Sequence, residues 1–316
     1  MKLVFMGSPE DVLGPLEALQ NAAHFELVAV VSQPPKEQGR GKTLQDTPVA
    51  MFAKAHNIKL LLPNQASDPL FLAELRELSP DVIITAAYGQ MLSDEFLRIP
   101  KRATINIHPS LLPKYRGATP VPAALLAGDQ VTGVSILFTV KKMDAGAIIL
   151  KKEFSIGTHE TSLELTARLF KESCPLLLEA LELLDDPSFT GTSQDEGQVV
   201  SCRKISKGDG VVDWNLDART LVQQFRAYAG WPGSVASIQG QRVLITNLKV
   251  SSYPMKLAPG VFMYDKGSQQ LRVGTHSECL EISKVKPAGK NEMDAAAFFN
   301  GLQAKGVTQF DDPTHL

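Results

Sequence analysis

The chain has 316 residues, of which 44% are hydrophobic and 21% are charged, with 32 Lys and Arg against 34 Asp and Glu. These proportions are ordinary for a folded globular protein, and they exclude a disordered or collagen-like chain. Because a typical domain has about 100 to 200 residues, we expect two units.

Apolar runs are short throughout the chain. The longest, such as residues 28–31 and 82–87, are much shorter than the roughly 20 residues that a membrane helix needs. The first residues, Met1-Lys2-Leu3, lack the layout of a signal peptide. We therefore expect a cytoplasmic protein without a membrane partner, and we take it to be a monomer.

Short β-branched runs alternate with helical patterns in the first half of the chain. The first run ends at Gly7, and Ser8 and Pro9 then provide an N-cap and a first helical position. Further strands are expected at residues 27–32, 82–86, 104–108 and 134–140, and helices at 48–57, 68–78 and 162–184. This alternation predicts an α/β fold with a doubly wound, mostly parallel, Rossmann-like sheet, whose functional loops follow the carboxyl ends of the strands.

A change of composition divides the chain after residue 189. Residues 191–197, Gly-Thr-Ser-Gln-Asp-Glu-Gly, are typical of a linker. Beyond them, one helix is expected at residues 217–228 and strands at 234–238, 241–250, 260–264, 270–275 and 279–285. We predict a catalytic domain at residues 1–189, a linker at 190–206 and a smaller β-barrel domain at 207–316.

The back third of the chain is basic. Residues 203–290 contain 13 Lys and Arg against 6 Asp and Glu, while the whole chain has a net charge of −2. Such a surplus is typical of a domain that binds a polyanion, although a solvated basic face without a partner is an equally ordinary explanation.

Several common cofactor sites are not indicated. The first turn, Gly7-Ser8-Pro9, lacks the later glycines of a dinucleotide fingerprint, and Gly41-Lys42-Thr43 lacks the earlier glycine of a phosphate loop. The three cysteines and six histidines show no metal-ligand spacing, so we expect no metal and interpret the cysteines as buried thiols.

Polar side chains gather where a buried strand ends. Asn106 and His108 point to the same side of the strand at 104–108, because side chains alternate along a strand. Asp144 follows the next long strand, and we expect it at the same carboxyl edge, near the imidazole. His108 assisted by Asp144 could take a proton from an attacking amine, and the Asn106 amide could stabilise an oxyanion. The alternative is a satisfied polar pair at a strand end.

These residues also occur in a recognisable set of motifs. Asn106-x-His108, Ser110-Leu-Leu-Pro113, Tyr115-Arg-Gly117 and Met143-Asp-x-Gly146 together resemble the signature of the 10-formyltetrahydrofolate-dependent formyltransferases. The resemblance implies that Asn106, His108 and Asp144 are catalytic and that 10-formyltetrahydrofolate is the formyl donor. It also implies that the turn lines the folate site, through Ser110, Leu111, Leu112 and Pro113. Read alone, Leu111 and Leu112 could equally be core residues.

Other segments resemble the members of that family that act on initiator methionyl-tRNA. Residues 39–42, Gly-Arg-Gly-Lys, are similar to their basic insertion, which implies that Arg40 and Lys42 contact the tRNA; a merely solvated turn is the alternative. Residues 203–207, 212–214 and 226–233 are similar to their linker and second domain. The resemblance implies formyl transfer to the methionine α-amino group of initiator tRNA. A relative that acts on an amino sugar nucleotide, or a non-catalytic RNA-binding relative, is the alternative.

Overall fold

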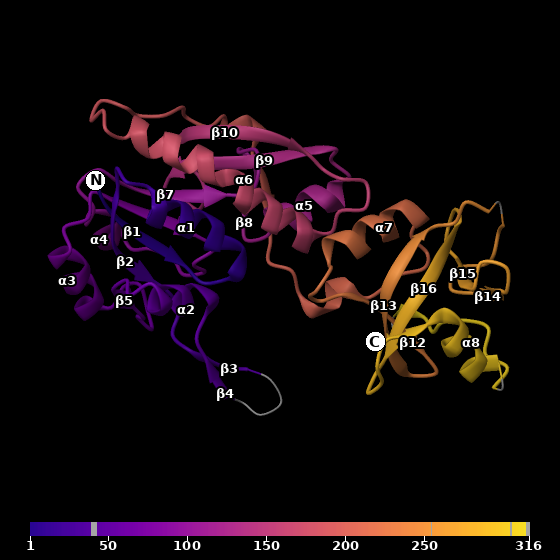
Figure 1. Ribbon diagram of the computed structural model, residues 1–316. Coiled ribbons are helices and arrows are strands. Elements are labelled where there is room, and N and C mark those ends of the chain that lie inside the picture. The colour runs from indigo at the N-terminus through magenta and orange to yellow at the C-terminus, as the bar shows by residue number, and fades with distance from the viewer. Residues whose placement is uncertain (39–42, 254, 304, 314–316) are drawn as a thin grey trace. The chain divides into compact units, whose positions relative to one another are not determined.

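The computed structural model describes residues 1–38, 43–253, 255–303 and 305–313. Two compact units form along the chain (Figure 1). The first unit comprises residues 1–120, 130–156 and 164–203, and the second comprises residues 121–129, 157–163 and 204–316. Among the described residues, no helix is both long enough and apolar enough to cross a membrane.

The first unit is built on a seven-stranded sheet with the strand order β10-β9-β7-β6-β1-β2-β5. Five neighbouring strands are parallel, and β9 and β10 at one end are antiparallel. The bounds are β1 (Lys2–Gly7), β2 (Glu26–Val31), β5 (Leu60–Leu61), β6 (Val82–Ala86), β7 (Ala103–His108), β9 (Val131–Phe138) and β10 (Ile148–Ser155). The predicted doubly wound, mostly parallel sheet is thus confirmed.

Helices connect these strands, and capping residues account for where several of them begin. Thr47 accepts a hydrogen bond from Ala50 N at the start of α2, and Asp68 accepts one from Leu70 N at the start of α3, each followed by proline at the first helical position. The helices of this part of the chain are α1 (Leu13–Asn21), α2 (Pro48–Ala55), α3 (Pro69–Glu77), α4 (Asp94–Leu97), α5 (Pro120–Ala127) and α6 (Ser162–Leu183).

The expected N-cap at Ser8 is wrong. A 3₁₀ turn, η1 (Glu10–Val12), precedes α1, and Pro9 is its N-terminal flanking residue. The Ser8 hydroxyl instead accepts a hydrogen bond from the backbone N–H of Gln33, which follows the neighbouring strand β2. The serine therefore joins two strand ends instead of capping a helix.

The direction of β9 also differs from the expectation. It pairs antiparallel with β7, with His108 opposite Ser135 and Ile105 opposite Phe138. The carboxyl end of β9 therefore lies beside the start of β7, and not at the carboxyl edge that the sequence predicts. The loop after β9 runs back before β10 begins, and this return brings Asp144 near His108.

Residues 190–206, predicted as a linker, carry regular structure. The 3₁₀ turn η2 (Glu196–Gln198) is followed by β11 (Val200–Cys202), which pairs in parallel with β8 (Lys114–Gly117). Thr192 also forms a bridge with Ile148. This stretch therefore belongs to the first unit as far as Arg203, because backbone hydrogen bonds tie it to the strand that follows His108.

The second unit contains a mainly antiparallel sheet with the strand order β12-β13-β16-β15-β14 and with β17 paired to β16. Its elements are η3 (Lys207–Gly210), α7 (Ala218–Ala227), β12 (Ser234–Ile238), β13 (Gln241–Val250), β14 (Phe262–Asp265), β15 (Gln270–Gly274), β16 (Cys279–Pro287), β17 (Met293–Asp294) and α8 (Ala295–Gln303). Apolar side chains of the sheet and of α7 and α8 form one core. The smaller C-terminal β-barrel domain predicted from the sequence is confirmed as a separate, smaller domain with an antiparallel sheet.

The two tryptophans differ in their surroundings. Trp214 is buried in the core of the second unit and stacks on Phe310, with ring centroids 5.0 Å apart. Trp231 is 60% exposed.

The three cysteines are free. Cys279 is buried, whereas Cys174 and Cys202 are only half-buried. The interpretation of the cysteines as buried thiols is therefore confirmed in full only for Cys279.

Candidate active site

His108, the last residue of β7, has an acceptor near each ring nitrogen. Its Nε2 lies 3.0 Å from the carbonyl oxygen of Tyr115, and its Nδ1 lies 3.7 Å from Asp144 Oδ1. A carbonyl oxygen only accepts, so Nε2 carries the hydrogen in the neutral ring and Nδ1 is the nitrogen that can take up a proton. Once protonated, the imidazolium has an acceptor on both sides.

The Asp144 carboxylate is held by the strand that follows the His108 turn. Its Oδ2 accepts a hydrogen bond of 2.9 Å from the backbone N–H of Gly117, which leaves Oδ1 toward His108. Only 13% of the Asp144 side chain and 5% of the His108 side chain are exposed, so water screens their interaction weakly. Asp144 and Tyr115 both have positive φ, 50° and 63°, a conformation that non-glycine residues adopt mainly at constrained or functional positions.

Asn106 lies two residues before His108 on the same strand and is half-buried. The hydroxyl of Thr85, on the neighbouring strand β6, donates a hydrogen bond of 2.9 Å to Asn106 Oδ1. Because the amide oxygen is engaged, the Nδ2 group is left to donate to a ligand. The structure thus brings His108 and Asp144 together, and it places Asn106 two residues before His108 on β7 with its amide oriented by Thr85.

The turn after β7 is held by the hydroxyls of Ser110 and of Ser135, which lies on β9. The Ser110 hydroxyl donates to Lys114 O, and the Ser135 hydroxyl donates to Ser110 O. Leu112 is fully buried against Leu137 and Ile148. Leu111 and Pro113 are half-buried, so a ligand would meet these two residues more readily than Ser110 or Leu112, whose side chains maintain the turn.

The pairing of β8 with β11 explains why glycine follows Arg116 at position 117. Gly117 has φ of 128°, and a Cβ atom at this position would lie 2.1 Å from the carbonyl oxygen of Cys202. Only glycine allows the two strands to approach this closely while its N–H contacts Asp144. Arg116 points the other way into a network with Gln194 and Glu196.

Arg40 and Lys42, predicted to contact tRNA, lie outside the described residues. In the sequence they fall between β3 (Lys36–Gln38) and β4 (Thr43–Gln45). These two strands pair antiparallel and extend away from the rest of the first unit (Figure 1). Their role stays a prediction.

Comparison with known proteins places the chain in a family. The model of a formyl transferase domain matches residues 1–181, and the model of a formyl transferase C-terminal domain matches residues 204–303. The chain belongs to the formyl transferase family. Curated relatives named methionyl-tRNA formyltransferase include those of Herpetosiphon aurantiacus, 37% identical over 98% of this chain and 100% of that protein, and Nitrosomonas eutropha, 35% identical over 99% of each.

Solved formyl transferase structures share the fold. The sugar 3N-formyl transferase WlaRD, crystallised with dTDP and 5-N-formyl-tetrahydrofolate, has a TM-score of 0.66 at 17% identity, over 92% of this chain and 99% of that one. HypX from Aquifex aeolicus in complex with tetrahydrofolic acid has a TM-score of 0.64 at 20% identity, over 98% of this chain and 48% of that one. At these identities the likeness supports the architecture of this formyl transferase, and not its acceptor.

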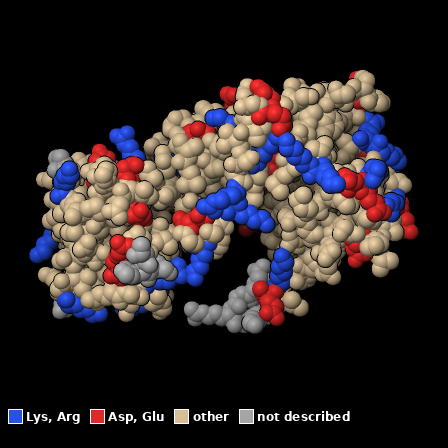
Figure 2. Space-filling model, turned by 180° about the vertical axis from the view of Figure 1, so that it is seen from behind, with Lys and Arg blue, Asp and Glu red and all other residues tan. Residues whose placement is uncertain are grey.

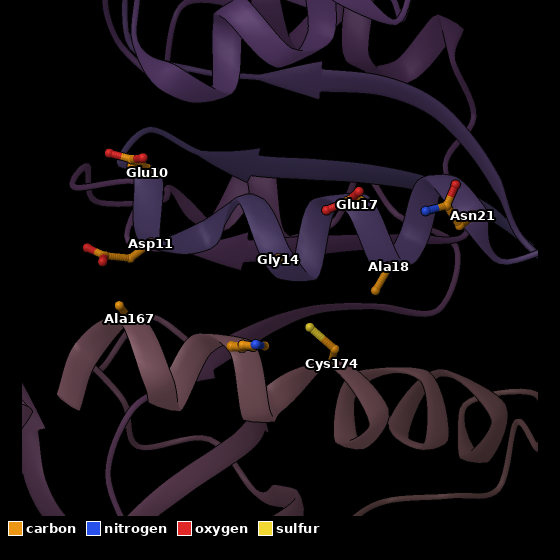
Figure 3. Close-up of a pocket in the computed structure, with 9 residues that line it drawn as sticks. Glu10, Asp11, Gly14, Glu17, Ala18, Asn21, Ala167 and Cys174 are labelled. Carbon is orange, nitrogen blue, oxygen red and sulfur yellow. The ribbon is translucent and has the colours of Figure 1, made fainter. Parts of the chain in front are cut away.

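A groove of about 700 Å³ lies between α1 and α6 of this formyl transferase (Figure 3). Its polar lining comes mainly from Glu10, Asp11, Glu17, Lys171 and Cys174. Burial, followed by the nearby Glu10 charge, raises the pKa of Asp11, and burial raises the pKa of Cys174. The lining residues are distinct from Asn106, His108 and Asp144, so this groove is separate from the candidate active site.

Metal-ligating side chains do not cluster in the described ranges, where no three His, Cys, Asp or Glu residues are placed to hold an ion.

The basic residues of the second unit do not form one uninterrupted patch on the face shown in Figure 2, where Lys and Arg side chains lie among acidic and uncharged ones. Some of them are paired, as Lys249 is with Glu281 at 3.3 Å.

Three contributors to the site carried no role in the sequence prediction. Thr85 was detectable in principle, because it is the polar residue within the buried apolar strand β6. The carbonyl of Tyr115 and the side chain of Gln194 were not, since a backbone acceptor leaves no sequence signal and Gln194 lies in a stretch whose composition is that of a linker.

Proposed function

We propose that this formyl transferase moves the formyl group of 10-formyltetrahydrofolate to the α-amino group of methionine carried by initiator tRNA. The observation that carries the chemistry is the placement of His108 between Asp144 Oδ1 and the carbonyl oxygen of Tyr115. The full-length similarity to relatives named methionyl-tRNA formyltransferase supports the acceptor.

The reaction needs one proton acceptor and one oxyanion donor. The amine nitrogen attacks the formyl carbon, and its proton passes to His108 Nδ1 as the new C–N bond forms. The Asp144 carboxylate stabilises the imidazolium, and the Asn106 Nδ2 group donates to the oxygen of the tetrahedral intermediate. The bond from the formyl carbon to the folate nitrogen then breaks, and the departing nitrogen takes up the proton.

The remaining roles follow from position. We propose that the turn of residues 110–113 borders the folate, chiefly through Leu111 and Pro113, and that Ser110 and Leu112 hold its shape. Arg40 and Lys42 are proposed to contact the tRNA. The division into a catalytic domain at residues 1–189 and a tRNA-binding domain at 207–316 is likewise a proposal, with residues 190–203 packed on the first unit.

The test is direct incubation of the purified protein with 10-formyltetrahydrofolate and charged initiator tRNA, scored for formyl-methionine. Parallel reactions contain uncharged tRNA or an amino sugar nucleotide. Formyl-methionine formed only with charged tRNA supports the proposal. Formylation of the sugar instead would assign the chain to the other acceptor, and tRNA binding without any transfer would indicate a non-catalytic relative.

A further inference from the structure

We propose that Gln194 is a positioning residue that holds Asp144 in place for proton transfer by His108. This inference rests on the proposed function, because it assumes that the Asp144 carboxylate acts with His108. Gln194 is half-buried and lies 50 residues after Asp144, in the stretch whose composition is typical of a linker.

Gln194 bridges the Asp144 loop and the strand β8. Its Nε2 donates to two carbonyl oxygens, that of Asp144 at 2.8 Å and that of Gly146 at 2.7 Å. Its Oε1 accepts a hydrogen bond of 3.0 Å from Arg116 Nε. Carbonyl oxygens only accept and a guanidinium only donates, so these partners allow one orientation of the amide. Arg116 is buried and thus orients Gln194 from the strand that follows the His108 turn.

A neighbouring residue fastens the same loop at a third point. Glu196 accepts from Arg116 Nη2 at 2.8 Å and from Lys142 Nζ at 2.7 Å. The loop is therefore tied at Lys142 by an exposed carboxylate, and at Asp144 and Gly146 by the Gln194 amide. The pair of Glu196 with Lys142 is exposed to solvent and contributes little, whereas the half-buried Gln194 contacts reach the backbone of Asp144 itself.

The backbone of Asp144 is in an uncommon conformation. Its φ of 50° lies in the left-handed region, which aspartate tolerates better than most residues with a Cβ atom, and tertiary contacts help to maintain it. The hydrogen bond from Gly117 N–H fixes one carboxylate oxygen, but the direction of the other depends on where the backbone lies. Without Gln194, the loop can relax and Oδ1 can move away from His108. A displacement of about 1 Å at a reacting group can lower the rate by about 100-fold.

Two variants separate the effect of the hydrogen bonds that Gln194 donates from the effect of its side-chain volume. Gln194→Met removes all its hydrogen bonds at similar size, and Gln194→Glu keeps an acceptor for Arg116 but offers no donor to the two carbonyls. Gln198→Met is the matched control, because the exposed Gln198 contacts Asp195 and not the loop. Each variant is measured for kcat, for KM with both substrates and for its thermal unfolding midpoint, in the parent and in an Asp144→Ala background.

We expect both Gln194 variants to lower kcat by about 10-fold or more, with KM values within about twofold and a near-parental unfolding midpoint. Gln198→Met should behave as the parent. In the Asp144→Ala background, Gln194→Met should change kcat by less than about twofold, because residues that act through one another are not additive. Equal reductions of kcat in both backgrounds, or parental kcat in Gln194→Glu, would overturn the assignment. If Asp144→Ala itself retains full kcat, the proposed catalytic role of Asp144 fails instead.

Discussion

The Thr85 hydroxyl donates to Asn106 Oδ1 over 2.9 Å, and the hydroxyl oxygen also lies 3.1 Å from the carbonyl oxygen of Ile105. A side chain of β6 therefore sets which end of the Asn106 amide is free. The proposed oxyanion donor thus depends on a residue of the neighbouring strand.

Replacing Thr85 should lower the rate through Asn106. Thr85→Val keeps the shape but removes the donor, so the Asn106 amide can turn its oxygen toward the developing negative charge. We expect kcat to fall by about 10-fold, less than the roughly 100- to 1,000-fold typical for removal of an oxyanion donor, with little change in folate affinity. Thr85→Ser keeps the hydroxyl and should restore most of the rate. Equal rates for Thr85→Val and Thr85→Ser would show that Asn106 is oriented by other contacts.

Removing either member of the proposed proton-transfer pair should affect the chemical step. His108→Ala and Asp144→Ala should each lower kcat by about 100- to 10,000-fold, the usual contribution of a general base, while the affinity for folate changes little. Single-turnover rates and folate binding measured on the same preparations separate these two effects. A His108→Ala enzyme with a near-parental single-turnover rate would contradict the assignment.

Local patterns predicted most of the elements, because each has its own signal. The strands β6, β12 and β13 have the predicted bounds, since apolar and β-branched runs end there at turn residues. The direction of β9 was not predictable in this way. Strand direction depends on the path of the connection, and the turn, β8 and α5 between β7 and β9 lead into an antiparallel pairing that alternation alone does not reveal.

The site was predictable where the residues carry their own chemistry. Asn106, His108 and Asp144 are recognisable because an amide, an imidazole and a carboxylate recur in known motifs. The contacts of Gln194 with Asp144 and of the Tyr115 carbonyl with His108 each involve a backbone oxygen, so only the fold shows them. The sequence predicted correctly that Asp144 lies near His108, but it did so from the wrong direction for β9. The two residues still meet, because the loop after β9 reverses the chain.

Acid should weaken the ties around the Asp144 loop. Hydrogen bonds from Arg116 and Lys142 lower the pKa of Glu196 from 4.5 to about 2. The stabilisation is therefore fully present above about pH 5 and disappears as the pH falls toward about 2. The unfolding midpoint of the parent should exceed that of Glu196→Gln above about pH 5, and the difference should shrink in acid. Glu77→Gln, which removes one exposed carboxylate of α3, is the control and should show no such convergence.

The last prediction concerns the basic surplus of the second unit. Lys204 and Lys207 are exposed where the chain enters that unit, and phosphate contacts there would position a tRNA without reading its bases. Lys249, which pairs with Glu281, is left unchanged. Changing both Lys204 and Lys207 to Gln should weaken tRNA binding. The slope of log affinity against log salt should also fall, by about 0.7 to 0.9 for each phosphate that is no longer neutralised.

A matched control removes the same charge elsewhere. Lys151→Gln with Lys152→Gln, both exposed on β10 of the first unit, should leave tRNA affinity and its salt slope close to the parental values. Folate affinity should be unchanged in both pairs. An unchanged slope for the Lys204 and Lys207 pair would mean that these charges only solvate the surface. An equal decrease in both pairs would mean that tRNA responds to net charge and not to a particular face.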